Sequence, residues 1–204
     1  MLGDLNITAI AVLIVSIIIS LVIHEFMHAY VGYLLGDTTA KQQGRISLNP
    51  LQHIDPVMTV LLPIVTLLIF HVPLLAAKPV PFDPRYVKYD EFGAALIAAA
   101  GPLSNLALAF LAALGLHIIT GDSFFVQALD FFMKINVAIF VFNILPIPPL
   151  DGSRVLYAFA PESVQRFMLQ MEPIGLFIVF GLVLAGGLAG FLGNLNTFVL
   201  NLLP

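Results

Sequence analysis

An apolar run without a charged residue covers residues 7–23, and the apolar pattern continues through HEFMHAYVGYLLG to Gly36. A helix of this length, rising 1.5 Å per residue, can cross a hydrocarbon core of roughly 30 Å. Further apolar runs occupy 92–119 and 131–150, and a glycine-rich run occupies 174–193. Because 60% of the residues are hydrophobic and only 10% are charged, the sequence predicts an all-α polytopic membrane protein. Soluble domains carry about 25% charged residues.

Proline interrupts the region between the first two predicted spans. Residues 57–77 are apolar but contain Pro63 and Pro73, and the following segment, AKPVPFDPRYVKYDE, is both proline-rich and charged. Proline removes a backbone donor and restricts the residue before it, so this connector is not expected to be helical. We therefore expect about four full transmembrane helices, one re-entrant or short apolar segment at 57–77, and a Pro-rich irregular connector.

Composition excludes several classes of function. The net charge is −4 and there is no long basic run, which argues against nucleic acid as a partner. The chain has no cysteine, so disulfides and thiolate metal sites are excluded, and any metal must be held by His, Asp, Glu or backbone oxygen. The first 23 residues contain no Lys or Arg, so we expect a retained anchor instead of a cleavable signal.

The distribution of basic residues predicts the orientation in the cell membrane. If 57–77 re-enters instead of crossing, seven of the eight basic residues fall on one side, which is then predicted to be cytosolic: Lys41, Arg45, Lys78, Arg85, Lys88, Arg154 and Arg166. The eighth, Lys134, lies one helical turn after Asp130 and can pair with it. The same orientation places the polar motifs described next near the cytosolic face.

The helix predicted at the start of the chain carries His24-Glu25-Phe26-Met27-His28, a His-Glu-x-x-His motif. Residues four apart lie on one face of a helix, so both imidazoles can bind one zinc ion. Glu25 lies beside them, where a carboxylate can take a proton from a water molecule that the metal activates. The alternative is a satisfied polar cluster between helices, but ionisable groups within a membrane span are costly and usually functional.

A catalytic zinc normally has three protein ligands, so a third is needed. The best candidate is Asp151 in NILPIPPLDG, where three prolines break the helix and Gly152 relaxes the backbone. Asp130 has a lysine partner, and the remaining acids considered lie in the charged connector: Asp83, Asp90 and Glu91. The alternative reading of Asp151 is a helix cap at a turn.

Three segments, HEFMHAYVGYLLGD, AAGPLSN and NILPIPPLDG, resemble in order the signature motifs of the site-2 protease family of intramembrane zinc metalloproteases. The resemblance covers about residues 5–160 and, with GRISLNPLQHIDP, points to a compact single-domain prokaryotic subgroup. It implies one metalloprotease domain over 1–204, with a glycine-rich C-terminal span at about 172–195.

The same resemblance implies the site residues. His24, His28 and Asp151 would hold one Zn²⁺, and Glu25 would be the catalytic base. Asn105 and Asn143 match the motif asparagines and are expected to hold the unwound substrate or its oxyanion, with an interhelical hydrogen bond as an equal alternative. His53 is a candidate accessory residue, although a loop role is favoured.

The function implied is hydrolysis of a peptide bond in or near the transmembrane helix of a membrane-spanning protein substrate. The alternatives are a membrane zinc transporter or sensor with the same ligands, and an inactive relative that binds membrane helices. His71 and His117 have no partner in the sequence and are read as structural. An oligomer stays open, because the glycine-rich last span can pack against a neighbour.

Overall fold

Helices make up most of the computed structural model, which describes residues 7–70, 78–119, 121 and 123–204. No strand occurs among these residues. Four described helices are long and apolar enough to cross a membrane: α1 (Ile7–Leu34), α4 (Asp90–Ile118), α5 (Phe124–Asn143) and α7 (Glu162–Leu184). The predicted all-α fold with about four spans is therefore confirmed, and the chain is a multi-pass membrane protein.

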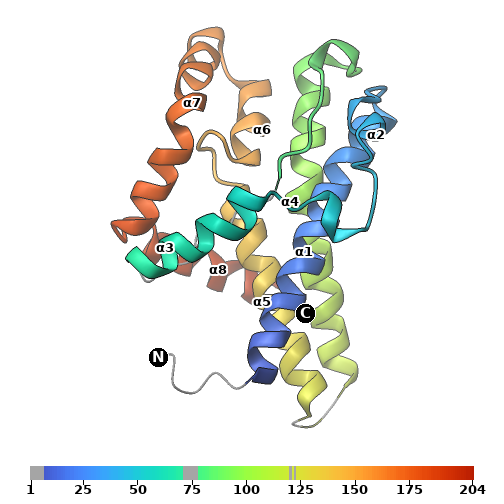
Figure 1. Cartoon of the computed structure of the whole chain (residues 1–204), viewed down its shortest axis with the longest axis vertical. Coiled ribbons are helices and arrows are strands. Elements are labelled where there is room, and N and C mark those ends of the chain that lie inside the picture. Colours follow the sequence, from blue (N-terminus) through green and yellow to red (C-terminus); the bar gives the residue numbers. More distant parts are fainter. Residues whose placement is uncertain (1–6, 71–77, 120, 122) are drawn as a thin grey trace.

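The long helices form two groups. Helices α1, α4 and α5 pack side by side, and α6 (Asp151–Phe159) joins this bundle by packing on α4 (Figure 1). Helix α7 stands on the far side of α6, and α8 (Ala189–Leu202) packs on α5. The shorter elements are α2 (Thr39–Gln42), η1 (Pro50–Gln52), η2 (Pro56–Leu61), α3 (Leu62–Phe70) and η3 (Pro84–Tyr86).

Small residues make α4 the most buried of the four long helices. Its alanines Ala98, Ala109, Ala112 and Ala113 are almost completely buried. Small side chains let neighbouring membrane helices approach closely. Consequently α4 lies between α1 and α5, and polar groups on these helices can meet inside the bundle.

Helix α1 ends at Leu34 and is stopped, as the sequence predicts, by Gly36, whose φ of 106° is in the left-handed region. The N–H of Gly36 bonds to Tyr33 O at 3.1 Å, and that of Asp37 bonds to Gly32 O at 3.0 Å. This is the Schellman pattern that closes a helix C-terminus. The buried Asp37 carboxylate also accepts the Asp83 N–H at 2.8 Å, so the connector is fastened to the end of α1.

The apolar segment at 57–77 is shorter than a membrane span where it is described. A π-helical turn, η2, leads into α3, and together they cover 56–70, about 22 Å at 1.5 Å per residue. Figure 1 shows α3 lying across the bundle instead of along it. Residues 71–77, with Pro73 and His71, lie outside the described residues, so re-entry stays a prediction.

Two predicted boundaries are wrong. The third span begins and ends earlier than expected, at 124–143 instead of 131–150, because the prolines after residue 145 cannot continue a helix. The last run is not one helix over 174–193: α7 ends at Leu184 and α8 starts at Ala189. Gly186 between them has a φ of 70°, a left-handed conformation that ends a helix.

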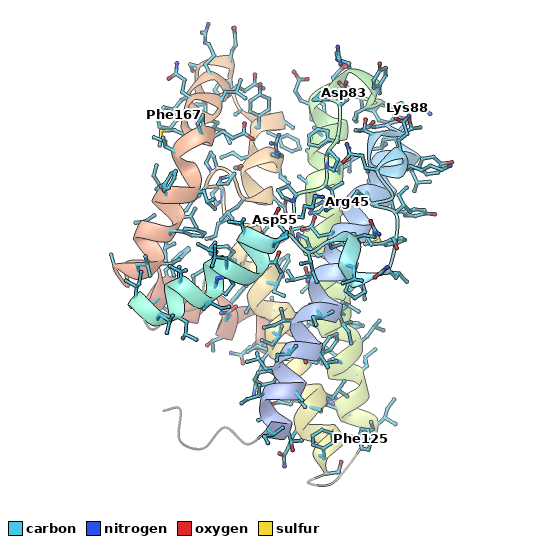
Figure 2. The ribbon with its side chains drawn as sticks, in the orientation of Figure 1. Arg45, Asp55, Asp83, Lys88, Phe125 and Phe167 are labelled. Carbon is cyan, nitrogen blue, oxygen red and sulfur yellow. The ribbon has the colours of Figure 1, made fainter. Side chains whose placement is uncertain are left out.

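One predicted pair of charged residues can be checked in the structure, whereas the side of the membrane on which the basic residues lie stays a prediction. Lys134 pairs with Asp130 within α5 at 2.6 Å, which confirms the predicted pair. Figure 2 shows Asp83 and Lys88 at the end of the molecule opposite Phe125. The side chain of Arg45, another of the basic residues, is only 2% exposed and lies deeper in the molecule than Asp83 and Lys88.

Candidate metal centre

Three side chains from α1 and α6 converge on one point. His24 Nε2 lies 3.0 Å from His28 Nε2 and 3.1 Å from Asp151 Oδ2. His28 Nε2 lies 3.3 Å from the same carboxylate oxygen. Both histidines are buried and Asp151 is half-buried. His28 is six residues before the end of α1 at Leu34, so the cluster is about 9 Å along the helix axis from that end.

The other ring nitrogen of each histidine is occupied. His24 Nδ1–H donates to Asn105 Oδ1 at 2.6 Å, and His28 Nδ1–H donates to the Ile97 carbonyl at 2.7 Å. Both acceptors are on α4. Such outer hydrogen bonds fix the tautomer of a metal-binding histidine and leave the Nε2 lone pair facing the metal.

A metal site explains the arrangement of these lone pairs better than a polar cluster whose hydrogen bonds are all satisfied. With both Nδ1 atoms protonated, the two Nε2 atoms and the carboxylate oxygen are three acceptors facing one another. They repel unless a proton or a metal ion lies between them. Their separations of 3.0–3.3 Å are close to the edge of about 3.3 Å in a tetrahedral zinc site with bonds near 2.0–2.1 Å.

Asn105 owes its orientation to a network inside the bundle. Its side chain is fully buried, and Nδ2 donates to Ser20 O at 3.2 Å and to Asn136 Oδ1 at 2.9 Å. Asn136 Nδ2 in turn donates to Phe132 O at 2.9 Å. Asn105 Oδ1 is therefore directed at His24, and the asparagine positions a metal ligand from α4.

Asp151 is held in place by a close approach of backbones. Helix α5 ends at Asn143, the prolines turn the chain, and α6 begins with Asp151 itself. A Cβ on Gly152 would lie 2.0 Å from Ile144 O, so only glycine fits there. As a metal ligand, Asp151 would bind through its ionised carboxylate.

Gly101 lies against both imidazoles. A Cβ at this position would come within 2.3 Å of His28 Nε2 and 2.7 Å of His24 Nε2. Real contacts of this kind do not occur at such distances, so any larger residue must displace the rings. The glycine on α4 therefore leaves the space in which an ion would be bound.

Replacing Gly101 by Ala is expected to lower zinc affinity by about tenfold or more, the size typical of a disturbed outer shell around a metal. Bound zinc per purified chain gives the measurement. Gly181→Ala is the matched control, because a Cβ at Gly181 in α7 would meet no atom of a described residue within 4 Å. Equal zinc content in the two variants would contradict this account of Gly101.

Glu25 is buried beside His24 at 8% exposure, and its carboxylate has no hydrogen-bond partner among the described residues. It is therefore free to accept a proton from a small molecule at the cluster. Arg45 contributes a nearby positive charge: burial lowers the pKa of its guanidinium, and the charge of Glu25 opposes that shift. Arg45 Nη2 donates to Lys78 O, while Nε and Nη1 have no hydrogen-bond partner among the residues that the structure describes.

From the sequence, Arg45 is predicted only as a charge on the cytosolic side, Gly101 only as part of the AAGPLSN motif, and Asn136 has no predicted role. The signal available for Arg45 was its place in GRISLNP, within the stretch matched to the compact subgroup. Nothing in the sequence separates Asn136 from other polar residues of a span.

The other predicted residues lie outside the cluster. Asn143 Nδ2 donates to Ile139 O in its own helix at 3.0 Å. The His53 ring donates from Nε2 to Ser47 O at 2.7 Å, and His53 O accepts the Lys78 N–H at 3.1 Å. These are contacts of a loop, and an accessory role of His53 stays a prediction. His117 Nδ1 contacts Ala113 O within α4 at 3.3 Å.

Comparison with known proteins gives one family. The sequence model of peptidase family M50 matches residues 117–186, a stretch that includes Asp151. YwhC of Bacillus subtilis is 39% identical over 185 residues, which cover 82% of this chain and 77% of YwhC. No solved structure matches the chain.

More distant relatives align over similar or shorter stretches. Rip2 of Mycolicibacterium smegmatis is 30% identical over 177 residues, 84% of this chain and 66% of Rip2. MJ0611 of Methanocaldococcus jannaschii is 38% identical over 89 residues, 44% of this chain and 46% of MJ0611. Each of the three relatives is named as a proposed zinc metalloprotease.

Proposed function

Because the chain belongs to peptidase family M50 and is a zinc metalloprotease, we propose that it is an intramembrane protease. Its reaction is hydrolysis of a peptide bond in or near the transmembrane helix of a protein substrate. The observation that carries this proposal is the convergence of His24, His28 and Asp151 within a bundle of membrane-spanning helices. A hydrolytic site at this depth is of use only for a substrate that is itself in the membrane.

The residues divide into three roles. His24, His28 and Asp151 hold one zinc ion per chain, and Asn105 and the Ile97 carbonyl orient the two rings. Zinc bound there supplies a Lewis acid that polarises the substrate carbonyl and lowers the pKa of water toward about 7. Glu25 accepts the proton of the attacking water and passes it to the leaving amine.

A helical substrate must unwind before cleavage, since its carbonyls are bound in the i to i−4 ladder. The connector offers a partner for the unwound strand. Its residues 79–82 are not helical, and none of their backbone groups bonds to a described residue. Positions 79 and 81 are prolines, so Val80 and Phe82 supply the two N–H groups, and all four residues supply carbonyls. The segment is held at both ends, by Lys78 N–H on His53 O and by Asp83 N–H on Asp37. An extended substrate can therefore pair along it, as in β-strand addition.

We further propose that the site opens to the cytosol. The connector with Asp83 and Lys88 and the start of α7 around Phe167 lie at the same end of the molecule (Figure 2). This agrees with the grouping of basic residues that favours the cytosolic side. Water reaches a site near that end without crossing the hydrocarbon core.

Topology reporters fused after Asp37 and after Glu91 are expected to report the same, cytosolic side. The expectation follows from an apolar segment at 57–77 that returns to the side from which it enters. A fusion after Gly121, between α4 and α5, serves as the control for the opposite side. Opposite signals from the first two fusions would contradict the re-entrant arrangement.

The activity is tested with the purified full chain, reconstituted in liposomes with a model single-span substrate. We expect bound zinc and cleavage, loss of cleavage when a chelator removes the metal, and recovery when zinc is added back. A zinc transporter or sensor would bind the metal without cleaving any substrate. Zinc binding without cleavage of a panel of single-span proteins would therefore overturn the proposed function.

A further inference from the structure

A cavity of about 560 Å³ lies between the connector, the first turn of α4, and helices α6 and α7. Pro148 and Ser153, on either side of Asp151 in the chain, both line it. The three candidate metal ligands, His24, His28 and Asp151, do not line this cavity. The cavity therefore adjoins the segment that carries the carboxylate ligand, without being the reaction site.

The basic side chains of the cavity are already paired. Arg85 Nη2 lies 2.6 Å from Asp83 Oδ2, and Arg154 Nη2 lies 2.5 Å from Glu172 Oε1. The Arg154 guanidinium also lies 5.4 Å from the centre of the Phe82 ring. These contacts join the connector, α6 and α7 around the cavity, and they leave little positive charge for an anionic ligand.

Two acidic side chains of the same cavity are not paired. Asp90 and Glu91 line it from the first turn of α4, and neither carboxylate has an ion-pair or hydrogen-bond partner among the described residues. The start of a helix favours acidic residues, which explains their presence but does not neutralise them. The cavity thus combines an apolar wall, with Phe82 and Tyr157, and two uncompensated negative charges.

We propose that this cavity binds the basic flank of the substrate, next to the membrane-spanning segment that is cleaved. The inference rests on the proposed function and names a substrate feature for it. Short cytosolic flanks of membrane proteins are rich in Lys and Arg, and the cavity lies at the end proposed to be cytosolic. A lysine or arginine head pairs with Asp90 and Glu91, and its apolar stem packs on Phe82 and Tyr157.

The experiment compares three single-span substrates that differ only in a cytosolic flank of Lys, Gln or Glu residues. With the zinc-loaded full chain in neutral liposomes, kcat/KM is expected to be about three- to tenfold higher for the Lys flank than for the Gln flank, as for one or two partly exposed ion pairs. The preference is expected to shrink as salt rises, because exposed charges are screened.

Substitutions assign the preference to the cavity. The double variant Asp90→Asn, Glu91→Gln is expected to lose it, and Glu91→Lys is expected to favour the Glu flank. The control is Glu162→Gln in the first turn of α7, whose carboxylate lies 3.5 Å from Arg166 and does not line the cavity. This control is expected to keep the preference of the wild type.

Two results would overturn the inference: equal cleavage of all three substrates by the wild type, or a Lys preference that survives in the double variant. If substitutions at the start of α4 prevent folding, cleavage of the three substrates by the wild type and its salt dependence still test the inference. Failure of the wild type to cleave any of the substrates would instead contradict the proposed function.

Discussion

Replacing Glu25 by Gln is expected to reduce peptide cleavage by about 10²- to 10⁴-fold, the usual contribution of a positioned general base, while zinc stays bound. Glutamine has the size and polarity of glutamate but cannot accept the proton of the attacking water. The Glu25 side chain makes no hydrogen bond to a described residue, so the substitution breaks no described hydrogen bond. Zinc content and kcat/KM are measured on the same preparation.

The control for Glu25→Gln is Glu162→Gln, the same chemical change at an exposed surface position. It is expected to retain both zinc and activity. Wild-type turnover by Glu25→Gln would show that another group takes the proton. Loss of zinc together with activity would show that Glu25 acts on the metal site instead of on water.

Replacing Asp151 by Ala is expected to remove both bound zinc and cleavage. The substitution leaves two imidazoles where a catalytic zinc normally has three protein ligands. The loss of affinity should exceed the 10- to 100-fold that results from losing an outer partner. Zinc titration and the cleavage assay give the two measurements.

The matched control is Asp130→Ala, which removes a carboxylate that pairs with Lys134 at the surface of α5. It is expected to keep zinc and activity. If Asp151→Ala binds zinc as tightly as Asp130→Ala, the carboxylate is not a ligand, and the proposed site must be reassigned.

Much of the fold was predictable because the membrane imposes a simple rule on the sequence. A span must be apolar over about 20 residues and must satisfy its own backbone hydrogen bonds. The first span and the number of long helices follow from this rule, and the helix stop at Gly36 follows from the preference of helix ends for glycine. The spacing of His24 and His28 places both rings on one helix face, since that relation is local.

Boundaries were less predictable where hydropathy and helix breaking disagree. The glycine-rich run at 174–193 is apolar throughout, so hydropathy alone joins it into one span. The structure separates it at Gly186, because the left-handed backbone there ends the helix. Hydropathy indicates whether a segment lies in lipid or in water, but it does not give the backbone conformation of a single residue.

The relations between distant segments depended on the tertiary structure. His24 and Asn105 are 81 residues apart, and His24 and Asp151 are 127 apart. The sequence named Asp151 as a candidate ligand, but its spacing does not give the contact between the members of either pair. The same is true of Gly101, whose missing Cβ leaves room for two rings on another helix, and of the cavity beside Asp90 and Glu91. Sequence determines which helices form and which groups they carry, because both are local properties. Only packing decides which of those groups meet, because their contacts depend on how α4 lies between α1 and α5.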